Sequence, residues 1–308
     1  MKRLAERAAA RAEARRFFDS RGFLEVETPL MVPSPGLDVH LDAFEVDVGG
    51  EATAPRPPRW LITSPEYQMK RLLAEGWTRI YQLVPCFRRG ERGALHNPEF
   101  TMLEWYRAGA GVADVMRDTE QLVAAVTGGE VRVEGRVVDV RPPFEHVSVC
   151  DAFARHAGWS REQTLDAARD DETRYFRAMV ERVEPALAAI DRGLFLVDYP
   201  ATQASLARTR PDDPLLAERF EAYVAGVELS NGFGELVDPV EQRARLVRDQ
   251  AARAAQGLPV YPIDERFLEA LGRLPPSAGN ALGFDRLVAL ACGEREIARV
   301  MAFADDDL

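Results

Sequence analysis

Alternating apolar and polar positions predict a β-hairpin in the first half of the chain. Residues 80–87 form an apolar run typical of a strand, and residues 100–106 form a second one. The segment between them is polar, contains glycine and carries several arginines. Glu104 and Tyr106 are two positions apart, so their side chains are expected on one face of the second strand. The pattern therefore predicts a hairpin with a cationic loop.

The rest of the chain alternates between helical periodicity and short apolar runs. A helix is predicted over residues 4–18, and Gly22 follows its end. Further helices are predicted at residues 65–73, 112–126, 147–156, 160–190, 239–256 and 262–273. Strands are predicted at residues 40–48, 60–63 and 194–199, as two runs between residues 218 and 239, and as a small hairpin over 128–141. Residues 51–59 read as a flexible loop because they are rich in proline.

Composition is that of a globular enzyme. The 308 residues are 46% hydrophobic and 29% charged, and they can bury one large core or two smaller ones. No apolar run is long enough to span a bilayer, and the charged N-terminal segment lacks a secretory core. The expected location is the cytoplasm.

Charge and cysteine content narrow the possible partners. The formal net charge of −11 gives no basic footprint of the kind that tRNA-binding proteins usually show, so tRNA binding is not expected. The three cysteines are widely spaced and form no CxxC pair, which indicates neither a disulfide framework nor a zinc site.

The hairpin loop and the segment before it carry the first candidate site. Arg88 ends the first strand, and an arginine offers a fixed fork of donors to phosphate oxygens. The alternative is a solvated surface loop. Ser64, Pro65 and Glu66 suit the first turn of a helix, so a purely structural role is also open for them.

Two further segments in the C-terminal half could bind a metal and phosphate. Glu228 and Glu235 are seven residues apart, and a turn or bulge at Asn231-Gly232 would bring both carboxylates to one cleft, where Mg²⁺ could bind. The alternative is two exposed carboxylates at strand ends. Small residues over 278–283 precede Arg286 at a helix start, which suits phosphate, although the glycines could serve only close packing.

Taken together and in order, these segments resemble the three motifs of the class II aminoacyl-tRNA synthetases in their lysine branch. FLEVETPLMVP with Pro29 is similar to motif 1, residues 79–106 to motif 2, and SAGNALGFDR to motif 3. SPEY and GVELSNGFGEL resemble further segments of the lysyl-tRNA synthetase catalytic domain. The resemblance implies an α+β fold with an antiparallel sheet flanked by helices, and a homodimer formed through motif 1.

The resemblance covers nearly all of residues 1–308 as a single catalytic domain, with only about twenty residues before motif 1 and no anticodon-binding domain. This resembles free-standing paralogues that attach (R)-β-lysine to elongation factor P. PATQASLA and Ala281 agree with that branch. Two alternatives stay open: a truncated lysyl-tRNA synthetase-like enzyme that charges tRNA, and a non-catalytic paralogue that binds a nucleotide or amino acid.

The family's reaction is a two-step acyl transfer that uses ATP and Mg²⁺, passes through an aminoacyl-adenylate and ends on a lysine of elongation factor P. By resemblance, Arg88 and Arg286 would be catalytic, and Glu228 and Glu235 would bind the metal. The residues implied for ATP are Arg88, Arg89, Gly90, Glu91, His96, Asn97, Phe100, Glu228, Leu229, Gly283 and Arg286. The residues implied for the amino acid are Ser64, Pro65, Glu66, Tyr106, Asn231, Glu235 and Ala281.

One position departs from the family pattern. Motif 2 usually reads Arg-x-Glu, with the glutamate on the adenine amine, whereas Arg88 is here followed by Arg89 and Gly90. The nearest carboxylate is Glu91, one residue later. Either the loop shifts so that Glu91 serves, or the adenine loses a contact.

Overall fold

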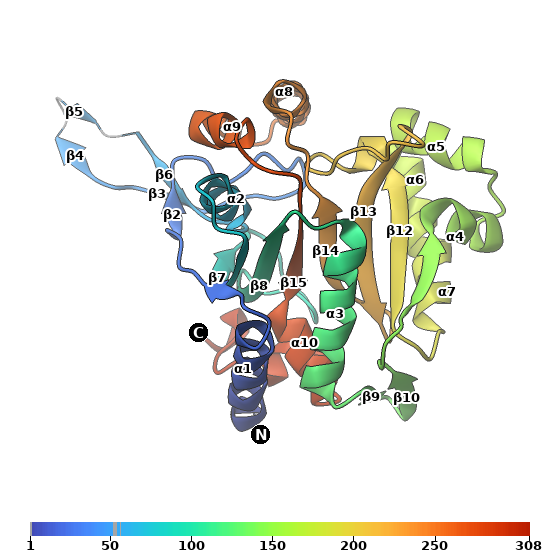
Figure 1. Cartoon of the computed structure of the whole chain (residues 1–308). Coiled ribbons are helices and arrows are strands. Elements are labelled where there is room, and N and C mark those ends of the chain that lie inside the picture. Colours follow the sequence, from blue (N-terminus) through green and yellow to red (C-terminus); the bar gives the residue numbers. More distant parts are fainter. Residues whose placement is uncertain (1, 52–53, 56) are drawn as a thin grey trace.

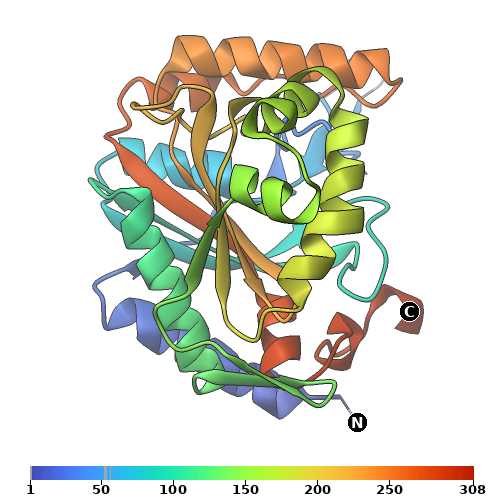
Figure 2. The same cartoon turned by 90° about the vertical axis from the view of Figure 1, so that its right-hand side faces the viewer.

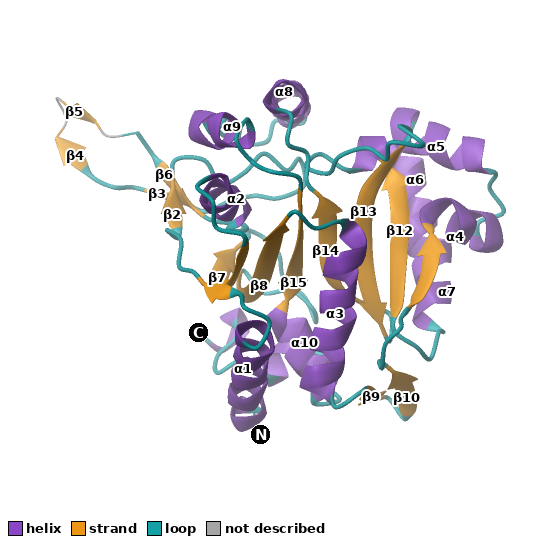
Figure 3. Cartoon of the chain, viewed as in Figure 1, coloured by secondary structure: helices purple, strands orange, loops and turns teal. Residues whose placement is uncertain are grey.

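An eight-stranded sheet organises the chain (Figures 1 and 3). The computed structural model describes residues 2–51, 54–55 and 57–308. The strand order is β1-β7-β8-β15-β14-β13-β12-β11; the pairs from β7 to β12 are antiparallel, and the two edge pairs are parallel. The strands are β1 (Leu24–Glu25), β7 (Arg79–Phe87), β8 (Glu99–Ala108), β11 (Glu145–Ser148), β12 (Leu194–Pro200), β13 (Leu216–Val224), β14 (Val227–Gly234) and β15 (Ser277–Gly283).

Helices cover both faces and one end of this sheet, which makes the fold α+β as predicted. They are α1 (Leu4–Asp19), α2 (Glu66–Ala74), α3 (Val112–Thr127), α4 (Val149–His156), α5 (Arg161–Asp170), α6 (Glu172–Ala178), α7 (Glu184–Ala188), α8 (Pro239–Ala255), α9 (Glu265–Leu271) and α10 (Phe284–Ala291). Small ladders join β2 (Met31–Val32), β6 (Arg59–Leu61) and β3 (Glu45–Val46), β4 (Gly50–Glu51) with β5 (Ala54–Pro55), and β9 (Glu130–Val133) with β10 (Arg136–Asp139). In the described part of the chain, no helix is both long and apolar enough to cross a membrane.

The two faces of the sheet differ because successive side chains of a strand point to opposite sides. On β8, Leu103 and Trp105 are buried in the core formed with α1, α3 and α10. Tyr106 packs in a second core with α2, α8 and α9. Figure 2 shows α4 to α7 gathered at the β11 end, where a third apolar cluster lies. The second face is therefore the one on which a polar site can open between helices.

The hairpin prediction is confirmed, because β7 and β8 pair along their whole length and place Leu83 opposite Leu103. The motif 3 prediction of a strand followed by a helix is also confirmed by β15 and α10. Other predictions need correction. The helix expected over 147–156 begins only at Val149, because residues 145–148 pair with β12. The run 40–48 yields only the two residues of β3, and the predicted loop 51–59 lies partly outside the described residues.

Candidate active site

A cavity of about 620 Å³ opens on the second face of the sheet. Its walls come from β8, β12, β13, β14 and β15, from the start of α2, from the loop over residues 34–41, and from α6 and the π-helical turn Met179–Val183 that follows it. Arg88 and Arg286 lie at one end, and Glu66 lies at the other. The predicted residues Tyr106 and Glu235 do not line the cavity: they are buried next to this second end, as is Glu104. The predicted residues that line the cavity are Ser64, Glu66, Arg88, Glu91, His96, Asn97, Phe100, Glu228, Leu229, Asn231, Ala281, Gly283 and Arg286.

The cationic end is built by motif 2 and motif 3 together. The guanidinium of Arg88 lies 5.0 Å from the ring centroid of Phe100, and its Nη1 lies 3.6 Å from Glu91. Arg286 donates from Nη1 to the carbonyl oxygen of Glu228 at 2.9 Å and from Nε to the carbonyl oxygen of Leu95 at 3.2 Å. These main-chain contacts fix the Arg286 side chain while leaving it at the cavity wall. The arrangement presents two fixed cations and an aromatic ring to one ligand.

Hydrogen bonds order the rest of this end. Arg286 Nη2 lies 2.8 Å from His96 Nε2, and burial together with the Arg286 charge lowers the pKa of His96. A neutral imidazole can therefore accept from Arg286. Asn97 donates to the carbonyl oxygen of Glu99 at 2.6 Å and accepts from the backbone N–H of Asp305 at 2.9 Å. Asn97 thus fastens the hairpin loop to the C-terminal segment.

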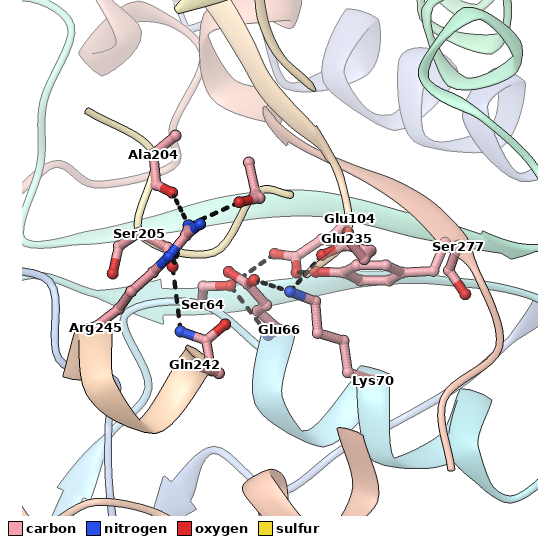
Figure 4. A network of polar contacts seen from close by, with 12 residues as sticks. Ser64, Glu66, Lys70, Glu104, Ala204, Ser205, Glu235, Gln242, Arg245 and Ser277 are labelled. Carbon is pink, nitrogen blue, oxygen red and sulfur yellow. Dashed lines mark hydrogen bonds and ion pairs between the residues drawn. The ribbon is translucent and has the colours of Figure 1, made fainter. Parts of the chain in front are cut away.

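The acidic end begins at the start of α2 (Figure 4). The Ser64 hydroxyl accepts from the backbone N–H of Glu66 at 3.0 Å and donates to Glu104 at 2.8 Å. The Tyr106 hydroxyl donates to the other Glu104 oxygen at 2.5 Å. Helix α2 begins at Glu66, one residue later than predicted, so Pro65 lies before it and does not line the cavity. Ser64 therefore caps the helix and also holds a buried carboxylate.

Lys70 lies at the centre of the acidic end, between Glu66 and Glu235 (Figure 4). Its ammonium is 2.5 Å from Glu235 Oε2 and also contacts Glu66. The Lys70 side chain is 1% exposed and that of Glu235 is fully buried. In the described part of the chain, no hydroxyl or amide donates to the Glu235 carboxylate. The ion pair with Lys70 is thus the contact that offsets the burial of this charge.

Burial shifts the titration of the whole group. It raises the pKa of Glu104 to about 8, with the Glu66 charge adding to the effect. It also raises the pKa of Glu235, although the Lys70 ammonium opposes this. Burial alone would lower the pKa of Lys70, but the charges of Glu235 and Glu66 outweigh it and hold that pKa above its usual value. Lys70 is therefore charged, and the buried carboxylates ionise readily only beside a cation.

Two small residues of motif 3, Gly279 and Ala281, lie against the acidic end. A Cβ on Gly279 would lie 2.2 Å from Tyr106 Cδ1 and 2.9 Å from Glu235 Oε1, closer than atoms can pack. Ala281 is paired with Glu104 on one neighbouring strand and with Asn231 on the other. The glycine allows Tyr106 and Glu235 to meet, and Ala281 lines the cavity between Glu104 and the predicted substrate residue Asn231.

The structure does not favour the prediction that Glu228 and Glu235 share one metal ion. Strand β14 continues through Asn231-Gly232, and the irregularity lies earlier, where Leu229 has no partner on β13. This bulge does place both carboxylates on one face, but they are about 20 Å apart along the strand. Glu235 pairs with Lys70, whereas Glu228 lies 3.8 Å from Arg286. Ligands of one Mg²⁺ would each need to lie within about 2.1 Å of it.

Glu221 was not identified from the sequence, and it is the carboxylate beside Glu228. It lies on β13, on the same face of the sheet and opposite Asn231. Burial and the Glu221 charge raise the pKa of Glu228. Glu221 accepts from Tyr223 at 2.8 Å and from Arg219 at 2.5 Å. In the residues that the structure describes, no group of three or more His, Cys, Asp or Glu side chains could hold a metal ion, so a cation here would have at most two carboxylate ligands.

Two residues of the hairpin loop lie away from the cavity. Arg89 has a half-exposed side chain 3.4 Å from Asp42, so it is turned toward the loop before β3. Gly90 has a φ of +86°, the left-handed conformation that favours glycine, and it does not line the cavity. Glu91 does line it, next to Arg88. The loop carboxylate that faces the cavity is thus Glu91, which lies one residue after the position of the glutamate in the family pattern.

Lys70 was also missed, although the sequence contains a signal for it. The chain has 39 lysine and arginine residues, and only Lys2 and Lys70 are lysines. A lysine at residue 70 in so arginine-rich a chain is unusual by composition alone. Glu221 offers no such signal, because its role depends on the pairing of two strands.

Comparison with known proteins agrees with this geometry. Residues 1–307 match the family model of the class II tRNA synthetases (D, K and N). The chain therefore belongs to this family of ligase enzymes, as its motifs predicted.

Relatives in Enterobacter sp. (strain 638), Klebsiella pneumoniae (strain 342) and Salmonella schwarzengrund (strain CVM19633) are named elongation factor P–(R)-β-lysine ligase. They are 43%, 42% and 41% identical to this chain, and the alignments cover 98% of it and 95% of each relative.

Proposed function

We propose that this chain activates (R)-β-lysine, or lysine, with ATP and transfers it to the ε-amine of a lysine on elongation factor P. The substrate carboxylate attacks the α-phosphorus of ATP, pyrophosphate leaves, and an aminoacyl-adenylate forms. The acceptor amine then attacks the adenylate carbonyl, an amide forms, and AMP leaves. The family match, and relatives of nearly equal length that carry this name, support the assignment.

The opposite charges at the two ends of one cavity carry the proposal. Arg88 and Arg286 suit the phosphates and the substrate carboxylate, and Phe100 suits stacking against adenine. Glu66 and the buried Glu235 suit the ammonium groups of a basic amino acid. A polyphosphate and a diamino acid bound side by side would fit this arrangement of positive charge at one end and negative charge at the other. Because the chemistry is mainly positioning and charge stabilisation, the arginines need not act as nucleophiles.

The residues present fit a divalent cation at the phosphate end. Glu221 is buried, Glu228 has a side chain that is 41% exposed, and a cation between these neighbouring carboxylates would relieve their repulsion, consistent with the raised pKa of Glu228. Mg²⁺ bound there would neutralise charge on the triphosphate. Glu221 and Glu228 would hold it, and Arg286 would hold the terminal phosphate beside it. Glu91 is the candidate for the adenine amine, in place of the glutamate that Gly90 replaces.

The acceptor and the assembly are also part of the proposal. Elongation factor P is favoured over tRNA by the names of the relatives and by the net charge of −11. The Ala281 methyl group narrows the pocket beside Glu104, which suits an amino acid whose amine is displaced by one carbon. We infer a cytoplasmic homodimer formed around motif 1 near Pro29, acting through one catalytic domain over residues 1–308.

Amino-acid-dependent ATP–pyrophosphate exchange tests the activation step. Arg286→Ala removes a fixed cation from the phosphate end, so exchange should fall by at least about a hundredfold. Arg273→Ala is the matched control, because Arg273 is exposed and pairs with Glu269 on α9, away from the cavity. Near-normal exchange in the Arg286 variant would contradict the assignment. Radiolabel transfer to elongation factor P and to tRNA then identifies the acceptor, and labelling of tRNA alone would exclude the ligase reaction.

A further inference from the structure

Lys70 is a buried cation whose position calls for a functional explanation. Its side chain is 1% exposed, and its ammonium contacts Glu66 on α2 and Glu235 just after β14. Removing a charged group from water is costly, and an apolar residue of similar volume often serves stability as well or better. A buried lysine is therefore weak evidence of a stabilising role. Its contacts are the two carboxylates that the proposed function assigns to the substrate amines.

Composition strengthens this point. Of the 39 basic residues, only Lys2 and Lys70 are lysines, so arginine supplies the cations almost everywhere else in the chain. An ammonium is a compact charge on a flexible stem, whereas a guanidinium is planar and larger. Glu235, the partner of Lys70, is packed so closely that a Cβ on Gly279 would lie 2.9 Å from its Oε1. A compact ammonium suits so closely packed a partner better than a guanidinium does.

The charged groups around Lys70 are mostly acidic. Glu66, Glu104 and Glu235 are the carboxylates of the acidic end, and Tyr106 donates to one of them. Arg208 lies near Glu235 but is paired with Glu218 at 2.6 Å. Because burial raises the pKa of Glu104 to about 8, the charged groups near pH 7 are Glu66, Glu235 and Lys70, which leave an excess of one negative charge. A diamino acid whose carboxylate is held at the cationic end brings ammonium groups to this negatively charged end.

We propose that Lys70 is a positioning residue of the amino-acid pocket: it holds Glu66 and Glu235 in place and keeps the buried Glu235 ionised, so that this carboxylate can bind an ammonium group of the substrate. This inference rests on the proposed function. Without Lys70, Glu235 would be a buried carboxylate with no cation beside it, and it would take up a proton. A protonated Glu235 cannot form an ion pair with a substrate amine.

The test is the pH profile of the KM for (R)-β-lysine and for L-lysine, measured separately by ATP–pyrophosphate exchange between pH 6 and 9. In Lys70→Met we expect the KM for either amino acid at pH 7 to rise by about tenfold or more, because each unit of increase in the pKa of Glu235 lowers its ionised fraction about tenfold. The KM should recover toward pH 9, and the KM for ATP should stay unchanged. Such a shift of the profile would not follow from a merely structural role.

Lys2→Met is the matched control, since it removes the other lysine. Lys2 is one-third exposed and pairs with Asp307 at the chain ends, so the KM and its pH profile should equal those of the parent. A second variant guards against misfolding of Lys70→Met. Lys70→Met/Glu235→Gln removes both buried charges, and we expect a high KM that no longer changes with pH in this range.

The outcomes separate the two proposals. If the parent enzyme shows exchange, and Lys70→Met keeps the parental KM and pH profile, the role of Lys70 is overturned alone. The same holds if Lys70→Met is unfolded in thermal melts and the double variant keeps the parental pH profile. If the parent shows no exchange with either amino acid, the proposed function is overturned, and the role of Lys70 falls with it.

Discussion

Gly279 is the residue at which a single added methyl group should disturb the amino-acid pocket most directly. It lies in the middle of β15, opposite Tyr106 on β8 and Phe233 on β14. The Cβ of Gly279→Ala would meet Tyr106 Cδ1 at 2.2 Å, Cε1 at 2.3 Å and Glu235 Oε1 at 2.9 Å. Tyr106 is 3% exposed and its hydroxyl is bonded to Glu104, so the ring has little freedom to retreat.

The cost can be worked out from overpacking, which destabilises buried sites by about 1–3 kcal/mol. If about 2 kcal/mol is lost from binding of the amino acid in the transition state, kcat/KM for the amino acid drops about thirtyfold, since 1.36 kcal/mol corresponds to a factor of ten. If the same energy falls on folding, Tm drops by about 4 °C for a chain of this size. The KM for ATP should change little, because Phe100 and Arg286 lie at the other end of the cavity.

ATP–pyrophosphate exchange and thermal unfolding, measured on the same preparation, would show how much of the cost lowers kcat/KM and how much lowers the stability of the fold. Gly272→Ala is the matched control: its Cβ would come no nearer than 3.6 Å to another atom, and its backbone is in an ordinary helical conformation. That variant should be neutral or slightly stabilised. A Gly279→Ala enzyme with parental Tm and parental kcat/KM would refute the reasoning, because it would show that Tyr106 has room to move.

Three further outcomes are expected. Glu221→Gln should raise the Mg²⁺ concentration for half-maximal exchange about tenfold, since one carboxylate of the pair is lost; an unchanged requirement would exclude Glu221 from the metal site. Arg7→Met should raise the KM for ATP about tenfold while leaving that for the amino acid unchanged, because Arg7 on α1 contacts both Asp285, beside Arg286, and the Thr101 hydroxyl, beside Phe100. In the parent enzyme, the KM for the amino acid should rise as pH falls through about 7. Burial raises the pKa of Glu235 to about that value, and below it the carboxylate that binds the ammonium is lost; a KM constant from pH 5.5 to 8 would contradict this.

Local patterns were sufficient where one segment carries its own signal. The hairpin β7–β8 could be predicted because apolar alternation continues on both sides of a polar loop. The strand and helix of motif 3 could be predicted because small residues and an arginine mark the junction. The cationic end of the cavity follows from these two segments, since Arg88 stands at the end of a predicted strand and Arg286 at the start of a predicted helix.

Other features depend on contacts that the sequence does not display. Strand β11 has only four residues, at the edge of the sheet, and its identity comes from pairing with β12. A lysine in the helical pattern of α2 is expected to be exposed. Lys70 is buried because the fold places Glu235, 165 residues later, in contact with it. The bulge at Leu229 is visible only against the register of β13. In each case a distant segment decides the role of the residue.

The bulge at Leu229 explains why one strand serves both ends of the cavity. Without an unpaired residue, the alternation of β14 would place Glu228 and Asn231 on opposite faces. With it, Glu228 lies opposite Tyr223 and Asn231 opposite Glu221, and both line the cavity. Glu235 follows on the same face, at the acidic end, where it contacts Lys70. The strand and the residue after it thus carry one carboxylate at each end, and under the proposed function their separation would keep a metal ion and a substrate ammonium from competing for one glutamate.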